Sequence, residues 1–156
     1  MSIFQLQSKV AVLGISVLFL ILSGNSVGQD RNRVCTTTEA QRAEAEAETL
    51  RSWDALYVSF RRYAQCDDGA IAEGYSESVA RILVGHWSKL NRLALVSDKD
   101  HAFRRFVTRH IDPTVSASDL EKIRSLANRK CAEGLERLCD ELGKRAESAL
   151  HPSFIK

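Results

Sequence analysis

The sequence has little proline, no cysteine spacing typical of a metal site, and almost no excess of charge. Only two of its 156 residues are proline, and no segment alternates apolar and polar residues for long enough to predict a β-strand. The absence of Cys-x-x-Cys argues against zinc, and the absence of Cys-x-x-Cys-His excludes a haem attachment site. With 22 basic and 20 acidic residues, nothing favours nucleic acid or an anionic membrane as a partner. We therefore expect no metal, no cofactor and no nucleic-acid partner.

No catalytic motif is visible either. The acidic turn Asp67–Gly69 lacks the series of oxygen ligands and the closing glutamate of an EF-hand calcium loop. No serine, histidine and acid are spaced in a way that predicts a triad. His86 lies on an apolar helical stripe beside Trp87, so we expect it to be partly buried and hydrogen-bonded rather than catalytic. We assign no catalytic residue and no metal ligand.

The first 28 residues read as a signal peptide. Lys9 precedes an unbroken apolar run, Val10–Leu22, whose 13 residues match a signal-peptide core and are too few to cross a bilayer as a helix. Ser26 and Gly28 suit the small-residue positions of a cleavage site, so the mature chain is expected to begin near Gln29. This pattern predicts export to the periplasm or the medium, with no membrane span after cleavage.

The first helical pattern follows this leader. Thr36 and Glu39 fit a capping box, which marks a helix start. Apolar residues then recur three and four positions apart, as on one buried face of a helix: Ala43, Ala47, Leu50, Trp53, Tyr57, Phe60 and Ala64. We expect one unbroken helix from about Thr38 to Gln65, which would span roughly 40 Å.

The rest of the chain repeats the helical period. A second long stripe runs from Tyr75 to Leu93, and three shorter patterns follow. The first has its helix cap within Ser97–Asp100 and places Phe103, Phe106, Val107 and His110 inward. The second begins at Ser116 with Asp119 or at Ser118 with Glu121, and the last covers about Ala132–Ala149. The sequence therefore predicts an all-α bundle of five helices, two long and three shorter. We expect an extended segment over 29–37, one helical domain over 38–150, and a short tail over 151–156.

Four cysteines remain after the leader: Cys35, Cys66, Cys131 and Cys139. An even number in an exported chain favours two structural disulfides, because such compartments are oxidising. Bridged cysteines need Cα atoms within about 7 Å of each other, so an unbroken helix between Cys35 and Cys66 would prevent them from pairing. Either each of these two pairs with one of the late cysteines, or Cys131 pairs with Cys139 and the other two stay unpaired.

Acidic and aromatic residues gather around the predicted start of the second long helix. Because turns carry function more often than helix middles, we expect any partner to bind here, on a surface formed by Asp67, Asp68, Glu73, Tyr75 and Glu77. The alternative is a small hydrolase of a cell-wall sugar polymer that uses Glu73 or Glu77, since paired carboxylates are what such chemistry needs. Glu77 followed by Ser78 resembles lytic transglycosylases, in which a serine follows the catalytic glutamate. The glycine-rich and glutamine-containing motifs that should come after this pair are missing, which disfavours the hydrolase alternative.

The segment from Gln65 to Trp87, with Trp53–Tyr57 upstream, resembles a group of small exported bacterial proteins of unknown function. The resemblance covers most of the mature chain and includes the segment CDDGAIAEGYS and the two late cysteines. It implies a location in the bacterial envelope or outside the cell, and it implies no activity, ligand or catalytic residue. We therefore expect a non-enzymatic binding or interaction protein of the envelope, whose partner is a protein or a small ligand.

Overall fold

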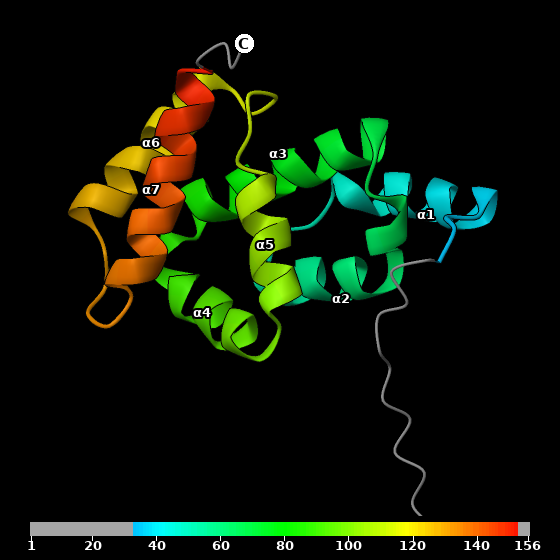
Figure 1. Cartoon of the computed structure of the whole chain (residues 1–156), viewed down its shortest axis with the longest axis horizontal. Helices are drawn as coiled ribbons and strands as arrows, with labels where there is room; N and C mark the ends of the chain where they lie inside the picture. The colour runs from blue at the N-terminus through cyan, green and yellow to red at the C-terminus, as the bar shows by residue number, and fades with distance from the viewer. Residues whose placement is uncertain (1–32, 153–156) are drawn as a thin grey trace, which may run out of the picture. The chain divides into compact units, whose positions relative to one another are not determined.

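Residues 33–152 are described by the computed structural model, and they form an all-α fold (Figure 1). This part of the chain has no β-strand and contains seven α-helices and two 3₁₀ turns: α1 (Thr37–Ala47), α2 (Trp53–Tyr63), η1 (Ala64–Cys66), α3 (Gly69–Gly85), η2 (Trp87–Lys89), α4 (Leu90–Lys99), α5 (His101–Arg109), α6 (Ala117–Arg129) and α7 (Glu136–Leu150). The all-α prediction is confirmed, whereas the predicted count of five helices is wrong. The predicted leader and its cleavage site lie outside the described residues.

The first predicted long helix is in fact two helices. α1 ends at Ala47 and α2 begins at Trp53, with a non-helical link between them. At the start of α2 the Ser52 hydroxyl accepts a hydrogen bond from the Ala55 N–H at 3.2 Å, which is a helix N-cap. The apolar stripe keeps its helical spacing across this link, so periodicity alone does not mark the break.

Side chains from elsewhere in the chain satisfy the carbonyl groups at the end of α1. A helix leaves its last carbonyls without partners inside the helix. Two side chains of α3 supply some of the missing donors: the Ser78 hydroxyl donates to the Ala47 carbonyl, and Arg81 donates to the Glu48 carbonyl at 2.9 Å. Arg51, within the link, also donates to the Glu48 carbonyl, at 3.0 Å. The end of α1 is thus stabilised by contacts that form only when α3 packs against it.

The second predicted long helix is also divided. α3 begins earlier than expected, because the Asp68 carboxylate caps it by accepting from the Gly69 N–H at 2.8 Å. It ends at Gly85, and the turn η2 leads into the separate helix α4. Gly74 does not interrupt α3. Instead it lets α1 approach closely, since an added Cβ would lie 3.0 Å from the Cβ of Ala47.

Capping side chains start two of the shorter helices where the sequence predicted them. The Asp100 carboxylate accepts hydrogen bonds from the N–H groups of Ala102 and Phe103 at the start of α5. The Ser116 hydroxyl accepts from the Asp119 N–H at 3.2 Å at the start of α6. These caps depend on neighbouring residues alone, which is why sequence reasoning located them.

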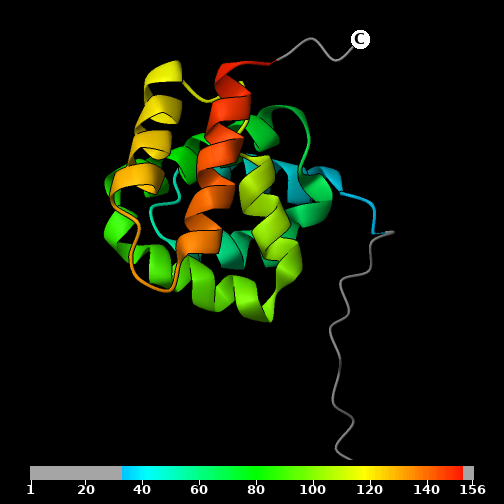
Figure 2. The same cartoon turned by 60° about the vertical axis from the view of Figure 1, so that its left-hand side comes forward.

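The last two helices form an antiparallel pair, α6 and α7, which lie side by side in both views (Figures 1 and 2). α7 begins at Glu136 rather than at the predicted Ala132, because the residues before it form a turn in which Gly134 has φ +80°. A salt bridge of 2.6 Å joins Arg124 of α6 to Glu147 of α7. The pair forms one end of the described residues, and α1 lies at the opposite end (Figure 1).

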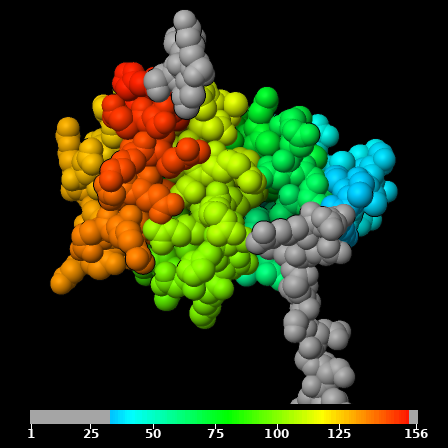
Figure 3. All heavy atoms as spheres, viewed as in Figure 1, coloured from blue at the N-terminus to red at the C-terminus, as the bar shows by residue number. Residues whose placement is uncertain are grey.

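The centre of the fold is α3, which packs against α1, α2 and α6. Beside it, α2 and α5 contribute rings to an aromatic cluster that includes Tyr57, Phe60, Tyr75, Phe103 and Phe106. The rings of Phe60 and Phe106 have centroids 4.9 Å apart, and those of Tyr75 and Phe106 are 5.1 Å apart in an edge-to-face arrangement. α5 also contacts α7, and the two meet on the face shown in Figure 3.

Both disulfides form, but one of them joins the two cysteines that the sequence analysis kept apart. Cys35 bonds to Cys66, with Cα atoms 4.9 Å apart, and Cys131 bonds to Cys139, with Cα atoms 6.0 Å apart. The prediction that Cys35 and Cys66 cannot pair is wrong, because it required an unbroken helix between them. The link after Ala47 turns α2 back along α1, which brings η1 to the start of α1.

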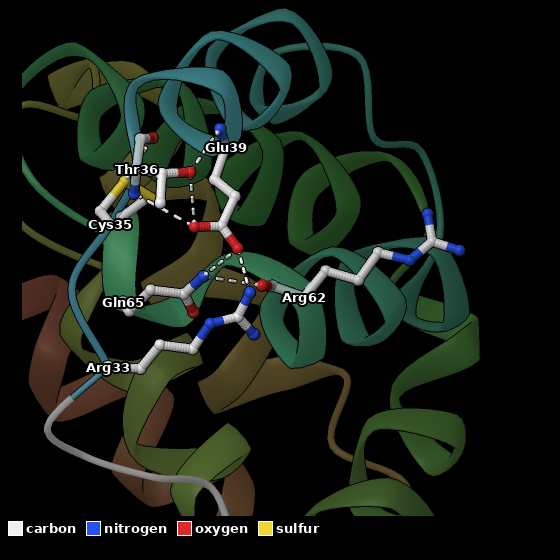
Figure 4. The surroundings of a disulfide bond; sticks show 7 residues. Arg33, Cys35, Thr36, Glu39, Arg62 and Gln65 are labelled. Atoms are coloured by element: carbon white, nitrogen blue, oxygen red, sulfur yellow. Dashed lines mark hydrogen bonds and ion pairs between the residues drawn. A yellow bond between two sulfur atoms is a disulfide. The ribbon is translucent and has the colours of Figure 1, made fainter.

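The Cys35–Cys66 disulfide is reinforced by a polar cluster around Glu39 (Figure 4). The Glu39 carboxylate accepts from the Thr36 N–H at 3.1 Å and forms an ion pair with Arg33. It also accepts from the Gln65 side chain at 3.4 Å, on the residue next to Cys66. The hydrogen bonds from the backbone and hydroxyl of Thr36 lower the pKa of Glu39, and Arg33 adds to this effect. Glu39 therefore holds together the two segments that the disulfide joins.

Candidate functional site

The five residues predicted to form a binding surface do not all reach the surface. Tyr75 is fully buried, and the side chain of Asp67 is only 4 % exposed. Asp68, Glu73 and Glu77 are exposed on the first half of α3. The structure thus divides the predicted set into a buried part and three exposed carboxylates, which we call the α3 carboxylate face.

The α3 carboxylate face makes few contacts with the rest of the fold. Glu77 forms an exposed pair with Arg81 at 3.5 Å, four residues along the helix, and such pairs stabilise a helix by only a few tenths of a kcal/mol. Asp68 caps α3 through one hydrogen bond, and asparagine would do the same. The fold therefore places little demand on these three charges.

Glu73 and Glu77 lie one helical turn apart on the same side of α3. A glycosidase holds its two carboxylates on opposite sides of the bond that it cleaves. One hollow on the described surface lies along α1, where it is lined by Gln41, Glu44, Ala45, Glu48 and Thr49. Neither Glu73 nor Glu77 lines that hollow.

Asp67, one of the two buried residues of the predicted set, belongs to a polar cluster between η1, α3 and the end of α5. The Nε2 atom of His110 lies 3.1 Å from Oδ1 of Asp67, and its Nδ1 atom lies 3.0 Å from the hydroxyl oxygen of Ser76. The Ser76 hydroxyl is also 2.9 Å from Oδ2 of Asp112, and Arg109 forms an ion pair with Asp67. We call these five residues the His110 junction.

The charges of the His110 junction decide the ionisation of Asp67. Burial alone would raise the pKa of this carboxyl, but the hydrogen bond and the charge of His110, together with Arg109, outweigh burial and lower the pKa. Asp67 is therefore ionised at neutral pH. Beside the junction, burial raises the pKa of Tyr75 to about 12, and its hydroxyl forms a hydrogen bond of 2.9 Å with Ser59.

A serine, a histidine and an aspartate are thus in contact, as they are in a hydrolase triad, but this serine cannot act as a nucleophile here. Ser76 is 1 % exposed, and its hydroxyl is also within hydrogen-bond distance of the Ala72 carbonyl, at 3.1 Å. A nucleophile must reach a bound substrate. The cluster joins parts of the fold and offers no reactive hydroxyl to solvent.

Sequence reasoning placed His110 on the inner side of its helix, which the structure confirms, but it did not identify the partners of this histidine. Asp67 and Ser76 precede it by 43 and 34 residues, so no local spacing reveals the cluster. The expectation for His86 is wrong: it is exposed, because α3 ends just before it. The buried histidine is His110, and its inward position on the helical stripe was the one sequence signal that pointed to the cluster.

Comparisons with known proteins assign no family to this chain. A scan against models of protein families, a search of curated proteins and a search of solved structures each find no match to this chain. Within residues 33–152, no three histidine, cysteine, aspartate or glutamate side chains are placed to hold a metal ion. None of the helices described there is long and apolar enough to cross a membrane.

Proposed function

We propose that this chain is an exported, disulfide-stapled helical protein of the bacterial envelope that binds a partner and has no catalytic activity of its own. The observation that carries the proposal is the division of polar groups. Its buried serine, histidine and aspartate are engaged with one another, while Asp68, Glu73 and Glu77 remain exposed with little structural role. Of the five residues predicted to form a binding surface, the three that are available to another molecule are therefore the carboxylates of the α3 carboxylate face.

Export is supported by the state of the cysteines. All four are paired in disulfides, and such bonds persist in the periplasm and outside the cell but are rare in the cytosol. The test is to express the full chain in a bacterium, separate the periplasm from the cytosol, and sequence the N-terminus of the product. Export predicts a periplasmic chain that begins near Gln29. Finding the intact chain in the cytosol with reduced cysteines would refute it.

Binding is tested by removing three charges without unfolding the protein. The variant Asp68→Asn/Glu73→Gln/Glu77→Gln keeps a helix cap at position 68 and similar side-chain volumes. A matched control removes three other exposed acids on other segments: Asp98→Asn, Glu121→Gln and Glu133→Gln. Both variants should unfold at the same urea concentration as the wild type, within error.

The two variants are then compared as bait in a crosslinking pull-down from envelope extract. The proposal predicts that proteins or ligands captured by the wild type and by the control are lost from the α3 variant. Unchanged capture by the α3 variant would remove this face from consideration. Release of sugar fragments from purified cell wall by the wild type, abolished by Glu77→Gln, would replace the proposal with the hydrolase alternative.

A further inference from the structure

Few large apolar side chains are exposed in the described part of the chain. Within residues 33–152 there are three: Val34, before α1, is 79 % exposed, Val58 on α2 is 46 % exposed, and Leu95 on α4 is 53 % exposed. A single exposed apolar residue is common on protein surfaces and needs no explanation. Val58 and Leu95 are a different case, because α2 and α4 contact each other along the lower edge of the fold in Figure 1.

Two ion pairs show how α2 and α4 are aligned. Near the start of both helices, the Nε atom of Arg92 donates to the Asp54 carboxylate at 2.8 Å. Toward their ends, Arg61 of α2 pairs with Asp100, the residue after α4, at 3.4 Å. Because the early residues pair with each other and the late residues do the same, α2 and α4 run side by side in the same direction.

Val58 and Leu95 lie between these two ion pairs. Val58 follows Asp54 by four residues and precedes Arg61 by three, a spacing that puts all three on one stripe of α2. Leu95 follows Arg92 by three residues, on the corresponding stripe of α4. Since each stripe carries side chains that join the helices, both border the line where α2 and α4 meet, and the two apolar side chains are neighbours across it. We call this set the α2–α4 ladder: Asp54, Val58, Arg61, Arg92, Leu95 and Asp100.

The ladder has the composition of a protein interface, which combines an apolar centre with a polar rim. The ion pair at its start is open to solvent, with the side chain of Asp54 59 % exposed and that of Arg92 50 % exposed. These charges can therefore form additional contacts without breaking the contact within the chain. With Lys99, which is also exposed on the α4 stripe, the surface carries three basic and two acidic residues. An excess of one positive charge is too small to select a strongly acidic partner.

The order of the charges fits a second copy of the same surface. At one end the acid is on α2 and the base on α4, and at the other end the base is on α2 and the acid follows α4. A two-fold axis along the line between the helices lays α2 of one copy over α4 of the other, with like ends together. Asp54 then faces the partner's Arg92, Val58 faces the partner's Leu95, and the late ion pairs match in the same way. Opposite charges and apolar side chains therefore meet along the ladder, as in an isologous contact.

We propose that the α2–α4 ladder is a self-association surface, on which a second copy of this chain docks about a two-fold axis. The contact is small, and small interfaces belong to weak, transient complexes. We therefore expect a dissociation constant of about 0.1–1 mM. The surface uses helices other than the one that carries the α3 carboxylate face, so this proposal is independent of the binding role given to that face.

Sedimentation equilibrium of protein purified from cells that express the full chain tests the proposal. The weight-average mass should rise from that of the monomer toward that of the dimer between about 10 µM and 1 mM. The variant Val58→Gln/Leu95→Gln should raise the dissociation constant about tenfold or more, whereas the control Val34→Gln should leave it unchanged. Both variants should keep the wild-type urea midpoint, because the replaced side chains are already exposed. A constant monomer mass, or equal association of the wild type and the double variant, would overturn the proposal.

A charge exchange tests the two-fold arrangement itself. Asp54→Arg/Arg92→Asp reverses the first ion pair within each copy. Two exchanged copies keep opposite charges in contact, so this protein should associate as the wild type does. A wild-type copy on an exchanged copy instead places acid over acid and base over base, and this mixed pair should bind about three- to tenfold more weakly. The mixed pair is measured by sedimentation of labelled exchanged protein in unlabelled wild type, and equal affinity would overturn the two-fold contact.

A different result would assign the ladder to another protein. In that case the wild type stays monomeric up to about 1 mM. Proteins captured from envelope extract by the wild type and by Val34→Gln are then lost from Val58→Gln/Leu95→Gln. This combination would refute a second copy as the occupant.

Discussion

Loss of the Cys35–Cys66 disulfide should destabilise the protein more than loss of the Cys131–Cys139 disulfide. A crosslink restricts the unfolded chain by an entropy that grows with the logarithm of the number of residues in the closed loop. The sequence separation of 31 gives about 3.7 kcal/mol for Cys35–Cys66 at 25 °C, and the separation of 8 gives about 2.5 kcal/mol for Cys131–Cys139. The expected difference is therefore about 1.2 kcal/mol.

The two disulfides are well matched for this comparison. Each has one buried cysteine, with Cys66 and Cys139 both 3 % exposed, and one partly buried cysteine, Cys35 or Cys131. Replacing each pair by alanine therefore removes a similar amount of packing. What differs between the two double variants is mainly the length of the loop that is released in the unfolded state.

The free energies of unfolding of the variants Cys35→Ala/Cys66→Ala and Cys131→Ala/Cys139→Ala are measured by urea titration with circular dichroism, each extrapolated to water. With a urea slope of about 1–3 kcal/mol per molar, the difference corresponds to about 0.4–1.2 M in midpoint. An equal or larger loss in Cys131→Ala/Cys139→Ala would refute the reasoning. So would a non-reducing peptide map in which Cys35 is joined to Cys131 or Cys139.

Three further predictions follow from the packing and the charges. Gly74→Ala should destabilise the protein by about 1–3 kcal/mol in the same urea assay, because the added Cβ would lie 3.0 Å from the Cβ of Ala47. As a control, Gly85→Ala should be neutral or stabilising by up to about 1 kcal/mol, because its added Cβ would have no neighbour within 4 Å. Tyr75→Phe should cost about 1–2 kcal/mol by leaving the buried Ser59 hydroxyl without its partner, and an unchanged midpoint would contradict the hydrogen bond. The pKa of Asp67 is lowered in the fold, so the stability that this carboxylate supplies is present above about pH 4 and is lost as the pH falls through the folded pKa. The free energy of unfolding of Asp67→Asn should therefore depend less steeply on pH below about 4 than that of the wild type.

The sequence predicted the features that depend on near neighbours. The helical class follows from apolar residues three and four positions apart, and the starts of α1, α5 and α6 follow from capping side chains within a few residues of the helix that they begin. The inward position of His110 follows in the same way from its helix. Each of these rests on interactions that are complete within one or two turns of chain.

Only the tertiary structure decided where the two long stripes break. The apolar period continues across both breaks, so nothing local distinguishes a long helix from two shorter ones with the same buried face. At the end of α1 the freed carbonyls of Ala47 and Glu48 accept hydrogen bonds from Ser78 and Arg81, which are more than thirty residues away. A helix can end where distant donors replace its own, and those donors are known only once α3 is in place.

The pairing of the cysteines and the partners of His110 depend on those breaks. With α2 folded back, Cys66 reaches Cys35, and the adjacent Asp67 is placed beside His110. The sequence by itself determined the helical class, the caps and an even set of cysteines, because these depend on composition and short spacing. Which cysteines pair, and which carboxylates are buried or exposed, depends on where the chain turns back, and that is set by contacts between residues far apart in sequence.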